Sequence, residues 1–172
     1  MVSLLTWIDR NDKKIFQYFN SYFENELINK IMLFITNLGG AVFTIGITIL
    51  MLLKSKYSYQ ALEGAVALTL SHVIVSFLKK MCLRPRPYQV IKNAKLLCKP
   101  LKDFSFPSGH TTAAFALSIS WSPNFVNLAP FLFILATLVG LSRVYLGMHY
   151  PSDTIIGAVI GTTSAIISMY II

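Results

Sequence analysis

The chain has 172 residues, of which 55% are hydrophobic and 13% charged, and its mean hydropathy is +0.62. A soluble domain carries about 25% charged residues, so this composition excludes an ordinary soluble protein and indicates one domain folded in a lipid bilayer. The net charge of +8 favours an anionic partner. Nucleic acid is excluded as that partner, because most of the basic residues lie between apolar segments and no nucleic-acid-binding motif surrounds them.

Residues 1–24 alternate apolar and charged side chains. The charged residues interrupt every apolar run, so neither a membrane span nor a cleavable signal peptide is expected here: Asp9, Arg10, Asp12, Lys13 and Lys14. The apolar residues could share one face of a helix: Leu4, Leu5, Ile8, Ile15, Phe16, Tyr18, Phe19, Tyr22 and Phe23. The pattern predicts an amphipathic helix lying on the membrane surface, although a helix packed on the rest of the protein would have the same pattern.

Residues 25–172 are predicted to form an all-α, polytopic membrane bundle of about five to six spans. The apolar segments that would cross are 31–53, 59–78, 108–121, 125–146 and 151–172. Gly39 and Gly40 would kink the first of them or allow a close helix contact. Glu63 and His72 lie in the second, where an ionisable residue is either functional or, more simply, near an interface (Glu63) or in an interhelical hydrogen bond (His72).

Eight of the 15 basic residues cluster after the second apolar segment: Lys79, Lys80, Arg84, Arg86, Lys92, Lys95, Lys99 and Lys102. Residues 81–106 are expected to form a loop, because prolines stop any continuous helix there. The loop contains Cys82 and Cys98. They would form a disulfide in an oxidising compartment and remain free thiols otherwise.

Alternating spans place the basic loop and residues 143–152 at one membrane face. Lys54, Lys56 and a turn at residues 122–124 would lie at the other face. The positive-inside rule puts the basic loop in the cytoplasm, whereas a loop kept basic to bind phosphate would break that rule. The orientation therefore stays open at this point.

The segment Pro107, Ser108, Gly109 and His110 opens the third apolar run. Ser108 is a good N-cap, and Gly109 would let another backbone approach closely. A helix that begins here presents unpaired N–H groups and the positive end of its dipole, which suits a phosphate. His110 would be aimed at the same place, or would be an ordinary solvated residue of the first turn.

His149 lies just before a helix that is expected to begin at Pro151, a favoured first position. Asp153, in the first turn of that helix, could fold back and fix the tautomer of the imidazole. A neutral histidine held in this way can attack phosphorus directly. The alternative is that Asp153 only caps its helix.

Three cations accompany these groups: Lys79, Arg86 and Arg143. Each could be a side chain that snorkels to the membrane edge, but together they would stabilise the charge of a phosphoryl group in transfer. Only Asp103 and Asp153 are acidic residues near them. No metal requirement and no cofactor are therefore expected.

These residues fall in three stretches of the sequence: 79–87, 107–110 and 142–153. Together, the three stretches resemble the type 2 phosphatidic acid phosphatase family, the membrane relatives of the vanadium haloperoxidases. That family has a lysine, six residues and Arg-Pro; then Pro-Ser-Gly-His; then Ser-Arg, five residues, His, three residues and Asp. Lys80 and Arg84 do not fit the first spacing. The matching positions are Lys79, Arg86, Pro87, Pro107, Ser108, Gly109, His110, Ser142, Arg143, His149 and Asp153.

The resemblance implies an integral, multi-pass protein of the plasma membrane with its active site at the extracellular or periplasmic face. His149 would be the nucleophile that forms a phosphohistidine, Asp153 would orient it, and His110 would protonate the leaving group. Water would then hydrolyse the phosphoenzyme. The phosphate would be held by Lys79, Arg86, Ser108, Gly109 and Arg143.

The resemblance implies a lipid phosphate or diphosphate as the substrate. Undecaprenyl diphosphate is favoured, with phosphatidylglycerophosphate and phosphatidic acid as alternatives. A vanadate-dependent haloperoxidase would use the same pocket, but the predicted spans and the lack of a large soluble domain argue against it. A non-enzymatic lipid-binding protein would not need His149 and Asp153 beside His110. The sequence does not indicate an oligomeric state.

Overall fold

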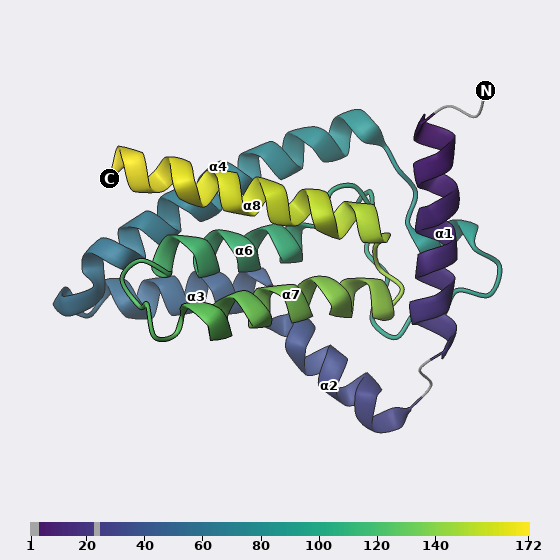
Figure 1. The fold of residues 1–172 in the computed structure, drawn as a ribbon, viewed down its shortest axis with the longest axis horizontal. Coiled ribbons are helices and arrows are strands. Elements are labelled where there is room, and N and C mark those ends of the chain that lie inside the picture. Colours follow the sequence, from purple (N-terminus) through teal and green to yellow (C-terminus); the bar gives the residue numbers. More distant parts are fainter. Residues whose placement is uncertain (1–3, 23–24) are drawn as a thin grey trace.

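Helices are the only regular elements in residues 4–22 and 25–172, the part of the chain that this computed structural model describes (Figure 1). The expected all-α fold is confirmed, and the loop at 81–106 contains one short helix, α5. The elements are α1 (Leu4–Tyr22), α2 (Glu26–Asn37), α3 (Ala41–Leu52), the 3-10 helix η1 (Ser55–Tyr57), α4 (Ser58–Cys82), α5 (Pro87–Val90), α6 (Gly109–Trp121), α7 (Ala129–Tyr145) and α8 (Pro151–Ile171).

The first helix, α1, runs across the end of the bundle rather than along it (Figure 1). Its buried edge consists of Asp12, Phe16 and Asn20, spaced four residues apart. The Phe16 ring lies against Tyr150, with centroids 5.9 Å apart. Thus α1 packs on the bundle through a partly polar edge, and its position on a membrane surface stays a prediction. The expected range 1–24 also includes residues 1–3 and 23–24, which lie outside the described part of the chain.

The first expected span, 31–53, is two helices. α2 and α3 meet at a bend of 50°, and Gly40 is the residue that precedes α3. A Cβ atom at Gly39 would lie 2.6 Å from the carbonyl oxygen of His110. The two glycines therefore do both things expected of them, since they mark a kink and allow α2 to approach the start of α6.

The central helix is α6, which contacts α3, α4, α7 and α8. Its contact with α8 is close, because a Cβ atom at Gly161 would lie 2.3 Å from the carbonyl oxygen of Thr112 and one at Gly157 would lie 2.7 Å from that of Ser108. Small residues at such positions let helix backbones approach in a membrane. The Ser108 amide also donates to the carbonyl oxygen of Asp153 at 3.0 Å, so the first turns of α6 and α8 are fixed to each other.

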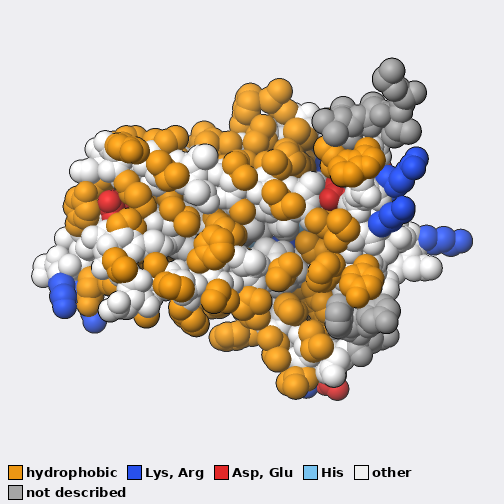
Figure 2. Space-filling model, viewed as in Figure 1, with side chains coloured by type: hydrophobic (Ala, Val, Ile, Leu, Met, Phe, Trp, Pro, Cys, Tyr) orange, Lys and Arg blue, Asp and Glu red, His pale blue; other side chains and the backbone are white. Residues whose placement is uncertain are grey.

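The outer surface suits a bilayer. Hydrophobic side chains cover the face shown in Figure 2, between two ends that carry Lys and Arg. Within the described residues, two helices are long and apolar enough to cross a membrane, one within Ser55–Val90 and one at Pro151–Ile171, or up to three if the bent α2–α3 pair is one span. α7 is apolar but shorter, and α6 has 13 residues. Large apolar side chains face outward: Phe34, Val42, Val73, Phe77, Phe131 and Ile155.

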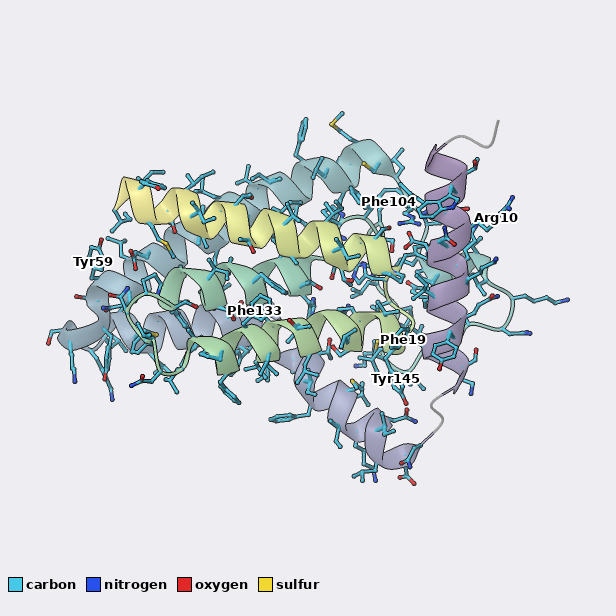
Figure 3. All side chains as sticks on the ribbon, in the orientation of Figure 1. Arg10, Phe19, Tyr59, Phe104, Phe133 and Tyr145 are labelled. Atoms are coloured by element: carbon cyan, nitrogen blue, oxygen red, sulfur yellow. The ribbon has the colours of Figure 1, made fainter. Side chains whose placement is uncertain are left out.

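The two ends of the bundle are those that alternating spans predict. The basic loop meets residues 143–152 beside α1, where Phe104 and Tyr145 lie, and Tyr59 lies at the opposite end (Figure 3). At that far end the Trp121 indole donates to the carbonyl oxygen of Gln60 at 2.9 Å. The basic loop, the start of α6 and residues 143–152 therefore converge at one end of the bundle, as predicted.

The structure also shows the surroundings of four other residues considered in the sequence: Glu63, His72, Cys82 and Cys98. Glu63 is buried at the far end, where it accepts a 3.3 Å hydrogen bond from Asn124, and His72 is exposed, 3.4 Å from the Ser76 hydroxyl. Neither contacts the converging stretches through these bonds. Cys82 and Cys98 are free thiols, so the structure has the second of the two expected arrangements.

Candidate active site

His149 lies in the turn between α7 and α8 and is 2% exposed. Arg86 Nη1 donates to its Nε2 at 3.2 Å and to the carbonyl oxygen of Met148 at 2.9 Å. A guanidinium has no acceptor, so Nε2 carries the lone pair and Nδ1 carries the proton. Nε2 therefore holds the electron pair that could attack a phosphoryl group, and in this structure that pair accepts the hydrogen bond from Arg86.

Asp153 holds the other side of the imidazole. Its Oδ2 lies 3.6 Å from His149 Nδ1, longer than a direct hydrogen bond. The same oxygen accepts the Ser105 hydroxyl at 2.5 Å and the Tyr150 amide at 2.9 Å, and the Ser105 oxygen is 3.5 Å from His149 Nδ1. Asp153 therefore caps the start of α8 and also faces the histidine, so capping is not its sole contact; its role in orienting His149 stays a prediction.

Burial keeps His149 neutral. Its pKa is lowered to about 3, chiefly because burial disfavours the protonated form; Asp153 opposes this, while Arg143 and Arg86 add to it. A neutral imidazole is the form that can act as a nucleophile. The position of His149 thus sets its charge state as well as its direction.

Asp103 aligns two of the expected phosphate-binding cations. Arg86 Nη2 donates to Asp103 Oδ1 at 2.7 Å, and Lys79 Nζ lies 3.0 Å from Asp103 Oδ2. Burial acts to raise the pKa of Asp103, but the hydrogen bond from Lys79 and the charges of Arg86 and Lys79 outweigh it, and the pKa is lowered. Asp103 is therefore an anion that bridges Lys79 and Arg86 beside His149.

Arg143, in the last turn of α7, is 3% exposed. Its Nη1 donates to the Thr36 hydroxyl of α2 at 2.7 Å. Its Nε is buried and, among the described residues, has no hydrogen-bond partner. The charge of Arg143 acts on both His149 and Cys98; burial raises the pKa of the Cys98 thiol although Arg143 and Arg86 oppose this. Arg143 is a fixed cation with spare donor capacity, rather than a snorkelling residue.

The start of α6 adds polar groups at the same end. Ser108 is fully buried and precedes the helix, but its hydroxyl pairs with that of Thr111 at 2.9 Å instead of capping an amide. A Cβ atom at Gly109 would meet nothing closer than Val75, at 3.8 Å. The expectation that another backbone approaches Gly109 is therefore wrong, because space rather than protein lies beside it.

His110 lies in the first turn of α6, near the bend between α2 and α3. A Cβ atom at Gly40 would lie 3.6 Å from its Nε2. Among the described residues, the His110 ring has no hydrogen-bond partner. It lines a cavity of about 430 Å³ between α3, α4 and α6. His110 thus lies between the polar groups at the start of α6 and an apolar cavity.

That cavity continues toward the cations. Its apolar walls include Ile45, Leu68 and Val73. A second cavity of about 480 Å³ is lined by Lys79, Asp103 and other residues, and it shares His72, Val75 and Gly109 with the first. An apolar cavity and a cavity lined by charged groups therefore adjoin each other.

Four residues of this cluster were not among the expected site residues: Asp12, Arg84, Asp103 and Ser105. Arg84 does not fit the family spacing, yet its Nη1 donates to Asp153 Oδ1 at 2.6 Å. Asp103 is outside the family motifs, and in the sequence it is marked only by its position near the basic residues. Within the described residues, no group of three or more His, Cys, Asp and Glu side chains is placed to hold a metal ion.

The all-helical fold, the apolar surface and a buried histidine beside a guanidinium and a carboxylate are features expected of a membrane enzyme that transfers phosphoryl groups. The chain is a member of the PAP2 superfamily, whose family model matches residues 60–172. The resemblance to type 2 phosphatidic acid phosphatases is thereby confirmed.

Individual proteins agree with this assignment. The chain is 28% identical to an undecaprenyl-diphosphatase of Sulfolobus acidocaldarius over 162 residues, which cover 92% of this chain and 77% of that one. The crystal structure of Aquifex aeolicus LpxE is similar with a TM-score of 0.83 at 30% identity, over 91% of this chain and 93% of that one. A phosphatidylglycerolphosphate phosphatase from Bacillus subtilis shares the fold, with a TM-score of 0.81 at 23% identity over 96% and 86% of the two chains.

Proposed function

We propose that this protein is a membrane lipid phosphatase that works through a phosphohistidine at His149, with the site residues expected from the sequence. It is a hydrolase of phosphate esters, as its family membership indicates. One observation carries the mechanism: His149 Nε2 accepts from Arg86 at 3.2 Å while its Nδ1 faces Asp153 at 3.6 Å. This arrangement leaves the nucleophilic lone pair pointing at the cations that would hold the phosphate.

In the first step, Nε2 of His149 attacks phosphorus and the bond from phosphorus to the leaving oxygen breaks. The leaving oxygen takes a proton from His110. Arg86, Lys79 and Arg143 stabilise the charge on the other phosphoryl oxygens. Asp153 stabilises the positive charge that develops on the imidazole.

In the second step, a water oxygen attacks the phosphorus of the phosphohistidine. His110, now without its proton, accepts one from the water. The nitrogen–phosphorus bond breaks and its electron pair returns to Nε2 of His149. Inorganic phosphate is released, and both histidines regain their starting states.

The cavities support a substrate taken from the bilayer. The apolar cavity is lined by Val73, which is 62% exposed on the outer surface, and the adjoining cavity is lined by Lys79 and Asp103. A lipid phosphate has this order of apolar and charged parts. The proposal includes five spans, formed by the α2–α3 pair, α4, α6, α7 and α8, in the plasma membrane, with the site at the extracellular or periplasmic face.

Undecaprenyl diphosphate is the proposed substrate, in which case undecaprenyl phosphate leaves in the first step. The support is the likeness to an undecaprenyl-diphosphatase over 92% of the chain. Phosphatidylglycerophosphate is the second candidate, because the chain is 28% identical over 148 residues to a phosphatidylglycerophosphatase of Bacillus subtilis. Phosphatidic acid stays a further alternative.

The test is phosphate release by the detergent-purified protein from these three lipids, with EDTA present. The wild type is compared with His149→Ala and His110→Ala. We expect His149→Ala to abolish release, and His110→Ala to slow it most for poor leaving groups. Full activity of His149→Ala would disprove the phosphohistidine mechanism, and loss of wild-type activity on adding EDTA would point to a metal ion.

A further inference from the structure

Asp12 lies on α1, outside the family motifs, yet it is only 5% exposed and sits behind the active site. Its Oδ1 accepts the backbone amide of Ser152 at 2.9 Å. Its Oδ2 accepts the Ser152 hydroxyl and, at 2.8 Å, Nη2 of Arg84. All these bonds reach across more than 70 residues of sequence, so they depend on how α1 docks.

Arg84 connects Asp12 to the site. Its Nη1 donates to Asp153 Oδ1 at 2.6 Å and to the Ser152 hydroxyl at 2.8 Å. Its guanidinium also stacks on the Tyr150 ring, 4.0 Å from the centroid. Arg84 is thus held between two buried carboxylates, one on α1 and one that faces His149.

The charge of Asp12 decides how Arg84 acts on Asp153. With Asp12 present, the guanidinium is shared between two carboxylates. Asp9, the other acid within reach, is 3.7 Å away and half exposed, so it is a weak substitute. The amide of Ser152 belongs to the first turn of α8, whose N–H groups lack partners within the helix, and Asp12 supplies that partner from another helix.

We propose that Asp12 is a positioning residue of the active site, which holds Arg84 and the first turn of α8 so that Asp153 stays aligned on His149. The N-terminal helix is then a part of the catalytic apparatus. The inference rests on the proposed function, because it assigns Asp12 a role in that reaction.

The test uses Asp12→Asn. This substitution keeps an acceptor for the Ser152 amide but removes the negative charge that Asp12 presents to Arg84. We expect kcat to fall about tenfold, the effect of roughly one strong hydrogen bond on a transition state. KM and inhibition by orthovanadate should change less than about twofold, because Lys79 and Arg143 do not contact Asp12.

The matched control is Asn20→Ala, on the same edge of α1. Asn20 donates to the carbonyl oxygens of Lys95 and Tyr145, both at 2.9 Å, and has no bond to Arg84 or Asp153. It should lower the thermal midpoint as Asp12→Asn does but leave kcat nearly unchanged. Equal losses of kcat in the two variants would mean that Asp12 only docks α1, and would overturn the inference.

A double-mutant cycle gives the second readout. Arg84→Gln should lower kcat at least as much as Asp12→Asn does. The double variant should be little worse than Arg84→Gln alone, because Asp12 acts through Arg84. Independent, multiplicative effects would contradict the inference. If Asp12→Asn does not fold, Asp12→Glu keeps the charge but displaces it, and it should still lower kcat more than Asn20→Ala does.

The wild type is assayed in the same series on the same lipids. Absence of phosphate release by the wild type would refute the proposed function itself. Release by the wild type that is matched by Asp12→Asn would refute only the role of Asp12. The two failures are therefore distinguishable.

Discussion

Ser105 donates a 2.5 Å hydrogen bond to Asp153 Oδ2, the oxygen that also faces His149. Asp153 is fully buried, so the Ser105 hydroxyl replaces water as a donor to this charge. We predict that Ser105→Ala lowers kcat about tenfold, since a hydrogen bond to a charged group contributes about 1.5–3 kcal/mol. Steady-state kinetics of phosphate release measure the effect.

The control for Ser105 is Ser164→Ala. Ser164 is 1% exposed in α8, and its hydroxyl has no hydrogen-bond partner among the described residues. This substitution also removes a buried hydroxyl and should leave kcat unchanged. A kcat for Ser105→Ala that matches the one for Ser164→Ala would show that the Ser105 bond has no part in catalysis.

Thr36 fixes Arg143 from a different helix, through the 2.7 Å bond to Nη1. Thr36→Val conserves the shape of the side chain but removes this acceptor and leaves a second guanidinium nitrogen unpaired. We predict that KM rises about three- to tenfold because phosphate is held by a less well oriented cation, while kcat changes less.

Thr48→Val is the matched variant for Thr36. Thr48 is equally buried, and among the described residues its hydroxyl bonds only to the carbonyl oxygen of Thr44 within α3. Its KM should equal that of the wild type. The role of Thr36 would be rejected if both threonine variants gave the same KM.

The low pKa of His149 predicts how stability depends on pH. The unfolded chain takes up a proton at His149 below its ordinary pKa of 6.5, whereas the folded protein does so only near pH 3. The contribution is therefore complete above pH 6.5 and is lost as the pH falls toward 3. The thermal midpoint should drop between pH 6.5 and 4.5, a window that lies above the titration of Asp103.

His149→Gln should weaken this dependence, because it removes one of the groups that titrate in this range. His72→Gln is the control, since His72 is an exposed histidine on a different element, α4. This variant should show the same change of the thermal midpoint with pH as the wild type. Identical slopes for all three proteins would show that the buried histidine does not carry the effect.

Part of this arrangement could be predicted from the sequence because it depends on local patterns. Apolar runs marked α4, α7 and α8, and their alternation placed the basic loop beside residues 143–152. Pro151 and Asp153 marked the start of α8, and that local geometry positions the carboxylate near His149. The family spacing then selected Lys79 and Arg86 from a row of basic residues.

The remainder depends on tertiary contacts that no local pattern encodes. The link from Asp12 to Arg84 needs α1 to lie across the end of the bundle, and an alternation of apolar and charged residues does not specify that position. The space beside Gly109 and the bond from Thr36 to Arg143 depend on the bend between α2 and α3. Ser105 lies in a loop without periodicity, so nothing in the sequence distinguished it from other serines.

The close contact of α6 and α8 carries the last prediction. A Cβ atom at Gly161 would lie 2.3 Å from the Thr112 carbonyl oxygen, so Gly161→Ala must push the two helices apart. Overpacking of this kind costs about 1–3 kcal/mol, and it would strain the backbone bond between Ser108 and Asp153 at the other end of the contact. We expect a lower thermal midpoint together with reduced phosphate release.

Gly46→Ala separates this effect from the general consequences of replacing a helical glycine. A Cβ atom at Gly46 would meet nothing within 4 Å, so this variant should be as stable as the wild type or slightly more so, because alanine favours the helix by about 1 kcal/mol. Thermal unfolding in detergent compares the three proteins directly. If Gly161→Ala unfolded at the same temperature as Gly46→Ala, the backbone contact of α6 and α8 would not be the constraint that aligns Ser108 with Asp153.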